Sequence, residues 1–383
     1  MEKIKTVFRR KFNRDAEVAA AAPGRLEILG NHTDYNEGVV LSCAVDQQTR
    51  VVMAKNSTGE ARLYDCRADS EAVFSISNFN NKLQPRWANY PAGVVSELQK
   101  RNFPVSGFDA VIDSTVPLSA GMSSSAAFEI SILFALMELN NLAIGKADAA
   151  RLGQGVENNF LGVKTGLLDQ FSSIFGVKDA FILSDFRTVE VLKSVSMAPE
   201  ASILVVNSME KHNLVDSEYN VRRAACESAA AKLAARHSSV KTLRDVSTEL
   251  LQSEKNILTD IEYRRALHVT GECERVFKAV EYLEQNDLVK FGDLWWQSHQ
   301  SSQCNFENST PALDKLIEIS STLPGALGAR LSGGGFGGIT IHLVRNENLA
   351  DYRASIVELY RKYAGVEAES IVCHPGCGAA VYK

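Results

Sequence analysis

The pattern of apolar and polar residues along the chain predicts a mixture of strands and helices. Short runs of apolar, β-branched residues predict strands at 50–54, 108–112, 203–206 and 339–344. Apolar residues recur at helical spacing in 88–99, 126–139, 216–234 and 264–284. The strands do not alternate with helices in a regular βαβ order. The pattern therefore favours an α+β fold over a doubly wound sheet.

Two apolar or amphipathic segments could be mistaken for targeting or membrane elements. The apolar stretch 126–139 is interrupted by Glu129 and Glu138 and is too short to span a bilayer, so it predicts a buried helix. The basic start of the chain, residues 1–18, contains acidic residues and no serine. It predicts a first surface helix rather than a transit peptide.

Composition narrows the class of protein without identifying it. The 383 residues are 45% hydrophobic and 23% charged, which is typical of a soluble globular protein long enough for two domains. The formal net charge of -5 leaves no electrostatic footprint for nucleic acid or for an anionic membrane. We therefore expect a small substrate, bound by local groups.

The cysteines favour reduced thiols in the cytoplasm. There are seven of them, an odd number, and no signal peptide is evident. Cys373 and Cys377 form the one close pair, but the three-residue gap and the lack of a second pair argue against zinc. A turn at Pro375 and Gly376, leading into a last strand, is the favoured interpretation.

The segment 22–38, APGRLEILGNHTDYNEG, carries the first candidate chemistry. Apolar residues give way to a dense group of hydrogen-bonding side chains between two glycines, which suits a loop around a polyhydroxylated ligand. Asp34 can accept two hydroxyl hydrogen bonds, and His32 can donate or accept one. Taken alone, a polar loop of this kind is more often a solvated turn.

The segment 116–127, VPLSAGMSSSAA, runs directly into the apolar helix. Small residues let the backbone approach a phosphate closely, and the helix points free N–H groups and its positive dipole end at the loop. The hydroxyls of Ser124 and Ser125 are ligands that Mg²⁺ accepts alongside phosphates. The alternative is a serine cap without a ligand. The GxxxxGK[ST] and GxGxxG signatures are absent, so any nucleotide is bound in another manner.

The segment 328–338, GARLSGGGFGG, places five glycines in the last six positions. Each glycine loses more conformational freedom on folding than another residue would, so such a run usually marks a tightly curled backbone. A glycine-rich hairpin or linker is the alternative, and the strand pattern that follows makes it less favoured.

These three segments, in this order and spacing, resemble the three motifs of the GHMP kinase superfamily. The first is similar to the galactokinase signature, as are WANY at 87–90, GLLDQF at 166–171 and DSEYNVRRAACE at 216–227. The resemblance implies an ATP-dependent sugar 1-kinase with Mg²⁺, folded as two α+β domains, 1–195 and 196–383, with the active site in the cleft between them. We further expect a monomer.

The resemblance also implies roles for single residues. Asp169 would stand beside the anomeric hydroxyl and Arg25 would pair with it, so that an acid orients or takes the proton while a cation steadies it. Glu157 and Ser125 would bind Mg²⁺. The sugar-contacting positions would be Asn31, His32, Asp34, Gly166 and Tyr219. The nucleotide-binding positions would be Trp87, Gly121, Ser123, Ser124, Ser125 and Ala126, although a core role for Trp87 is an alternative.

Two departures from the galactokinase pattern bear on the substrate. Asn31 stands where the family typically has glutamate, and Glu27 where it usually has asparagine. An amide at position 31 relaxes the charge restriction at C6, so galactose is the leading substrate, with galacturonate or another C6-modified galactose as the alternative.

Two other functions compete with catalysis by a sugar kinase. Galactokinase-like sugar sensors resemble the enzyme with a lesion in the serine-rich loop, whereas SSSAA at 123–127 is uninterrupted and favours catalysis. A mevalonate kinase fits poorly, because HTDYN and SEYNVRR resemble the sugar-kinase branch.

Overall fold

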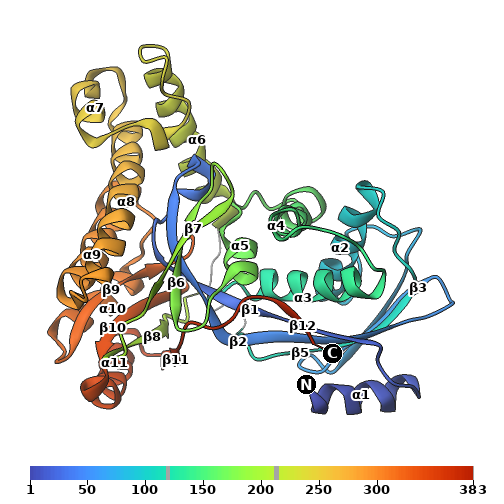
Figure 1. Cartoon of the computed structure of the whole chain (residues 1–383). Helices are drawn as coiled ribbons and strands as arrows, with labels where there is room; N and C mark the ends of the chain where they lie inside the picture. The colour runs from blue at the N-terminus through green and yellow to red at the C-terminus, as the bar shows by residue number, and fades with distance from the viewer. Residues whose placement is uncertain (118–120, 211–214, 383) are drawn as a thin grey trace.

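The computed structural model describes residues 1–117, 121–210 and 215–382, with the side chains of 215–217 left out of the description. Two sheets form its framework (Figure 1). The larger has the order β12-β1-β2-β5-β3-β4, with β6 pairing to β2 and to β7. Its strands are β1 (Val18–Leu29), β2 (Val39–Lys55), β3 (Glu60–Asp65), β4 (Ser70–Ser75), β5 (Phe108–Ser114), β6 (Ala180–Asp185), β7 (Glu190–Ser196) and β12 (Ala380–Tyr382).

The smaller sheet has the order β11-β8-β10-β9, and all of its pairings are antiparallel. Its strands are β8 (Ala201–Asn207), β9 (Ala326–Ser332), β10 (Ile339–Arg345) and β11 (Glu369–Cys373). In the larger sheet, β3 and β5 pair in parallel. The four predicted strands are confirmed, within β2, β5, β8 and β10.

Helices cover both sheets. They are α1 (Glu2–Phe12), α2 (Asn89–Lys100), α3 (Ser124–Leu139), α4 (Lys146–Gly155), α5 (Leu168–Phe175), α6 (Val215–Ala234), α7 (Thr248–Ser253), α8 (Asp260–Glu284), α9 (Leu288–Ser301), α10 (Pro311–Thr322) and α11 (Leu349–Ala364). The four predicted helices correspond to α2, α3, α6 and α8. The predicted first helix is α1, which buries Ile4 and Phe8 against the larger sheet.

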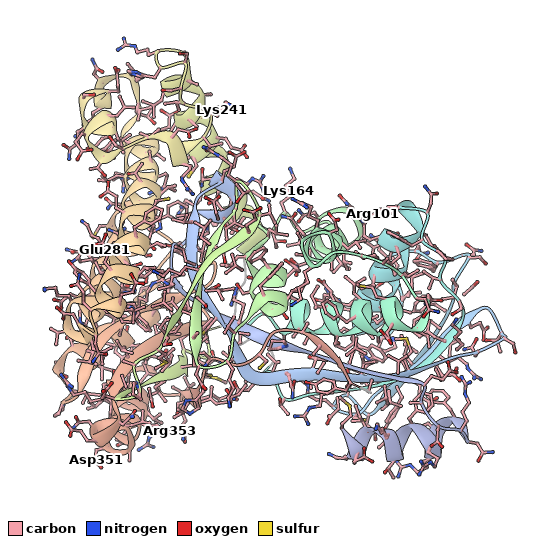
Figure 2. The ribbon with its side chains drawn as sticks, in the orientation of Figure 1. Arg101, Lys164, Lys241, Glu281, Asp351 and Arg353 are labelled. Carbon is pink, nitrogen blue, oxygen red and sulfur yellow. The ribbon has the colours of Figure 1, made fainter. Side chains whose placement is uncertain are left out.

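Each sheet face is paired with a distinct apolar core. Helices α2 to α5 pack over one face of the larger sheet, and the apolar helix α3 is buried there, as predicted. A second core joins β1 and β2 to the smaller sheet, α8 and α9, with Trp295 fully buried in it. Helices α6, α7 and α8 form a projecting bundle (Figure 1). In Figure 2, Lys241 is labelled beside that bundle, and Asp351, in α11, is labelled at the lower edge of the view.

The end of the chain returns to its beginning. β12 pairs antiparallel with β1, with Tyr382 opposite Ala19, so the predicted last strand is confirmed. Pro375 forms an isolated bridge with Val45, and no turn is assigned at Pro375 and Gly376. The α+β fold is therefore confirmed, while the division at residues 195 and 196 stays a prediction. All seven cysteines are free thiols. Among the described residues, no helix combines the length and the apolar character needed to cross a membrane.

Candidate active site

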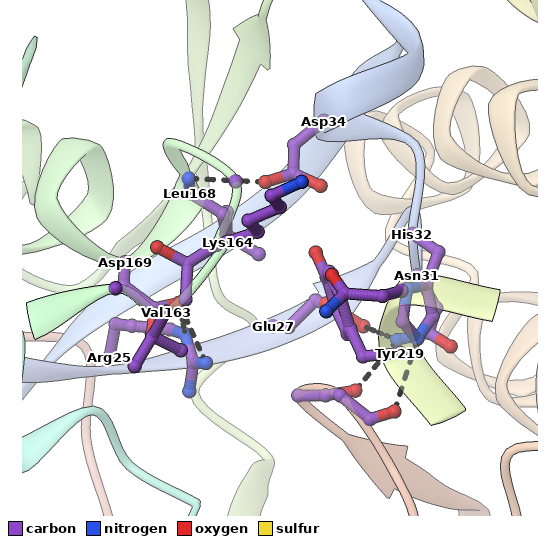
Figure 3. A pocket seen from close by; sticks show the side chains of 16 residues that line it. Arg25, Glu27, Asn31, His32, Asp34, Val163, Lys164, Leu168, Asp169 and Tyr219 are labelled. Atoms are coloured by element: carbon purple, nitrogen blue, oxygen red, sulfur yellow. Dashed lines mark hydrogen bonds and ion pairs between the residues drawn. The ribbon is translucent and has the colours of Figure 1, made fainter. Parts of the chain in front are cut away.

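A cavity of about 190 Å³ lies where β1, the loop before α5, α6 and the glycine-rich loop after β9 converge (Figure 3). It contains all seven residues that the sequence assigned to catalysis or sugar contact. Its lining residues are Arg25, Glu27, Asn31, His32, Asp34, Gly162, Val163, Lys164, Thr165, Gly166, Leu168, Asp169, Tyr219, Asn220, Gly333 and Gly334.

Arg25 and Asp169 form an ion pair at one end of this cavity. Arg25 Nε donates to Asp169 Oδ1 at 2.8 Å, and its Nη2 lies 2.8 Å from the same oxygen. A third donor, the hydroxyl of Ser123, binds Asp169 Oδ2. Arg25 also donates to the carbonyl of Gly121 at 2.6 Å. The pair thus links β1 and α5 to the serine-rich loop, with its acid fixed by three hydrogen-bonding groups.

A second cavity, of about 330 Å³, adjoins the first and shares its acid–cation pair. It is lined by the serine-rich loop at the start of α3 and by the glycine-rich loop. Gly121 has φ +60°, and a Cβ there would lie 2.8 Å from Ile339 Cγ1, so glycine is required at this turn. Of the predicted nucleotide residues, the lining includes Gly121, Ser123, Ser124 and Ser125.

Two other predicted nucleotide residues lie outside both cavities. Ala126 is buried in the first turn of α3. Trp87 donates from Nε1 to Ser70 Oγ at 2.9 Å and packs edge-on against Phe128 in the core. This contact agrees with the alternative core role for Trp87, and its nucleotide role stays a prediction. Residues 118–120 of the same motif lie outside the described residues.

Glu157 faces the serine-rich loop from a π-helical turn, Val156–Leu161. Its Oε1 accepts from Ser125 Oγ at 3.1 Å, and its Oε2 accepts from Thr165 Oγ1 at 2.6 Å. Burial, reinforced by the negative charge of Asp169, raises the pKa of Glu157. A buried carboxylate and a hydroxyl held side by side are hard oxygen donors, which fit Mg²⁺ and its demand for oxygen ligands.

Asp34 and Gly166 lie against each other. A Cβ at position 166 would lie 1.6 Å from Asp34 Oδ2, which explains why this position needs a glycine. The Leu168 N–H donates to the same oxygen at 3.4 Å. Burial, followed by the nearby charge of Asp169, raises the pKa of Asp34. Lys164, labelled together with Asp34 in Figure 3, lines the same cavity.

His32 joins the sugar loop to the glycine-rich loop. Its ring stacks on Phe306 at 4.3 Å and lies 5.1 Å from the ring of Tyr219. Nε2 is 3.1 Å from the carbonyl of Gly334, which can only accept, so Nε2 carries the proton and Nδ1 accepts from Tyr35. Burial lowers the pKa of His32 to about 3, so the ring is neutral.

Sequence reasoning missed the residues that hold the sugar loop from the second half of the chain. Glu272 on α8 accepts from the N–H groups of Gly30 and Asn31, both at 2.9 Å. His268 Nε2 lies 3.1 Å from the carbonyl of Asn31. Arg330 on β9, fully buried, is ion-paired with Glu27 at 2.9 Å. The one signal in the sequence was the presence of charged residues within otherwise apolar elements.

Family comparisons agree with this arrangement. The described fold and the adjoining cavities define a kinase of the GHMP type, and the family models match in order: the galactokinase galactose-binding signature at residues 6–55, and the GHMP kinase N-terminal and C-terminal domains at 89–177 and 279–358. A galactokinase of Glaesserella parasuis serovar 5 is 39% identical over 388 residues, covering 100% of this chain and 99% of that protein. The chain belongs to the galactokinase family, and it is an ATP-dependent sugar kinase.

Solved structures agree with the fold. The crystal structure of Lactococcus lactis galactokinase complexed with galactose has a TM-score of 0.93 and 28% identity, covering 99% of each chain. The mevalonate kinase of Methanococcus jannaschii has a TM-score of 0.63 at 18% identity, covering 94% of this chain and 98% of its own. The latter shares the fold alone.

Proposed function

We propose that this protein phosphorylates galactose at its anomeric hydroxyl, with ATP as the donor. The observation that carries the proposal is the Arg25–Asp169 pair at the junction of the two cavities. The first cavity would hold the sugar and the second the triphosphate, so the attacking oxygen and the γ-phosphorus would meet at this pair. The galactokinase relative and the galactose-bound neighbour agree with that choice of sugar.

Asp169 would accept or orient the proton of the C1 hydroxyl as its oxygen bonds to the γ-phosphorus. The bond from that phosphorus to the β–γ bridging oxygen breaks, and ADP leaves. Arg25 would hold Asp169 in place and stabilise the charge that develops on the transferred group. Ser123 would fix the second carboxylate oxygen, so the acid presents one orientation to the sugar.

The phosphates would lie against the serine-rich loop at the N-terminus of α3, where free N–H groups and the helix dipole favour anions. Glu157 and Ser125 would hold Mg²⁺ there. A Mg²⁺ ion held there would supply positive charge that offsets part of the negative charge of the phosphates.

Asp34, His32, Gly166 and Tyr219 would surround the sugar. Asp34 would accept hydroxyl hydrogen bonds, Gly166 would leave room for that carboxylate, and Tyr219 would offer a ring face to the sugar C–H groups. Asn31 lines the same cavity, but its amide donates to Glu27 and to the carbonyl of Gly333, so it would act on the sugar through Glu27. Galacturonate remains the competing substrate, on account of the amide at position 31.

An ADP-release assay over a panel of sugars tests the function. We expect turnover with galactose, a lower kcat/KM with galacturonate, and a sugar 1-phosphate identified by ³¹P NMR. Binding of both ligands without ADP release would instead indicate a sugar sensor. We further propose that the enzyme acts in the cytoplasm, where its seven free thiols would stay reduced, and that it acts as a monomer. Light scattering in solution tests the monomer.

A further inference from the structure

Glu27 lines the sugar cavity with one carboxylate oxygen already held by the protein. Oε1 accepts from Asn31 Nδ2 at 2.8 Å and from Arg330 Nη2 at 2.9 Å. Arg330 is buried behind it and also donates to the carbonyls of Glu27 and Ile28, at 3.1 and 2.8 Å. Among the described residues, Oε2 has no protein partner. The Glu27 side chain keeps 4% of its surface accessible, and it borders the sugar cavity.

Asn31, by contrast, is committed to the protein. One amide hydrogen goes to Glu27 and the other to the carbonyl of Gly333 at 2.8 Å. Its oxygen accepts from Asn308 Nδ2 at 3.0 Å. Turning this amide toward a sugar would break three hydrogen bonds at a site that is 1% exposed, and buried polar groups left unpaired are costly. Its evident action is to fix Glu27 in place.

We propose that Glu27 is a specificity-determining residue, whose Oε2 accepts a hydrogen bond from a sugar hydroxyl other than the one on C1. Asn31 and Arg330 are the positioning residues that hold it. The inference rests on the proposed function, because it names how the same cavity selects its sugar. Figure 3 shows Glu27 and Asn31 away from the Arg25–Asp169 pair, where the reaction would occur.

The assignment explains the two departures from the family pattern together. From the resemblance we expect an acid at position 31 and an amide at position 27, and this chain carries the reverse. Because the two side chains are hydrogen-bonded at 2.8 Å, the exchange keeps one carboxylate and one amide in the same wall of the cavity. The cavity has therefore not lost its carboxylate. Burial raises the pKa of Glu27 against the opposing charges of Arg330 and Arg25, and the ion pair with Arg330 at 2.9 Å favours the charged form. A C6 carboxylate would meet that charge, which disfavours galacturonate.

Glu27→Gln is a sharp test because the orientation of the new amide is dictated by its partners. Asn31 and Arg330 both donate to the Oε1 position, so the glutamine oxygen must take that place and its NH₂ must face the cavity. The cavity group thus changes from an acceptor into a donor, with little change of shape. The matched control is Asp109→Asn, which removes a fully buried carboxylate held by Arg14 and Arg62, both at 2.6 Å, in the sheet beneath α1.

The experiment measures kcat/KM, and sugar Kd by calorimetry, for galactose and its 2-, 3-, 4- and 6-fluoro analogues, in which fluorine cannot donate. In the wild type and in Asp109→Asn, the analogue altered at the hydroxyl facing Glu27 should be about ten- to a hundredfold worse than galactose, as for a lost bond to a charged group. In Glu27→Gln that one discrimination should fall below about threefold, while the discrimination at other positions is retained.

An unchanged analogue pattern in Glu27→Gln would overturn the proposal. If Glu27→Gln fails to fold, as judged by circular dichroism, Glu27→Asp replaces it. The aspartate keeps a charge opposite Arg330 but withdraws the oxygen from the cavity. The discrimination between galactose and the analogue altered at the hydroxyl facing Glu27 should again fall. An unchanged pattern in Glu27→Asp also overturns the assignment. Wild-type turnover of galactose tests the proposed function separately, and the calorimetric comparison decides on Glu27 even where turnover fails.

Discussion

Replacing Asp169 by asparagine removes a proton acceptor while leaving its surroundings in place. The carboxylate has one oxygen bound by Arg25 Nε and Nη2 and the other bound by the Ser123 hydroxyl. The asparagine oxygen can still accept from Arg25, and the hydroxyl can reorient to accept from the new NH₂. Because these contacts survive, we expect the free energy of unfolding to change by no more than about 1–2 kcal/mol.

We expect Asp169→Asn to lose activity in the chemical step. A positioned acid or base is worth about a hundredfold or more in rate, so kcat should fall by at least about 10², which corresponds to about 2.7 kcal/mol of barrier. A coupled ADP-release assay measures kcat, and calorimetry should show the Kd for ATP within a few-fold of wild type. Asp185→Asn is the control, since Asp185 is bound to Arg244 at 2.8 Å and lines neither cavity. Turnover of Asp169→Asn within threefold of wild type would refute the role of this acid.

Three further changes test the other parts of the site. Glu157→Ala should raise the magnesium concentration required for activity with little change in sugar affinity, and an unchanged magnesium titration would remove it as a ligand. Gly166→Ala places a methyl group 1.6 Å from Asp34 Oδ2 and should raise the KM for galactose about tenfold or more, whereas Gly145→Ala, whose nearest atom is 4.0 Å away, should not. Burial raises the pKa of Glu129 well above its usual value, so the folded chain holds a proton that the unfolded chain releases. The free energy of unfolding therefore falls as the pH rises past the ordinary glutamate range. Glu129→Gln should reduce this fall in the free energy of unfolding by about 1 kcal/mol or more between pH 5 and 8. If the unfolding midpoints of the variant and the wild type change equally with pH, the raised pKa of Glu129 is contradicted.

Local signals in the sequence were sufficient for the elements that carry the motifs. The helix predicted at 264–284 exists but begins earlier, at Asp260, because Thr259 and Glu262 form a capping box that the apolar periodicity does not reveal. The strand predicted at 50–54 is the end of β2, which starts at Val39 and passes through exposed and half-buried positions. Helix α9 was missed altogether, although it buries Trp295.

The site was predictable only as a set of motifs. The glycine at 166 and the acid at 34 could be assigned to the sugar through resemblance, but their contact depends on the fold. The same holds for Glu27, whose partner Arg330 is 303 residues away. No local pattern links such a pair, because both positions look like ordinary residues of a strand. The tertiary structure alone distinguishes the carboxylate that faces the cavity from the amide that holds it.

The anchoring of the sugar loop has a consequence for biosynthesis. Its N–H groups at Gly30 and Asn31 are bound by Glu272, which follows 242 and 241 residues later in the chain. A nascent polypeptide therefore exposes the whole signature of its substrate loop long before the ribosome has made the helix that shapes it. Sugar affinity should arise late, once α8 and β9 have emerged and docked. Binding of galactose to stalled chains of increasing length would then report the moment at which the two halves of the protein close.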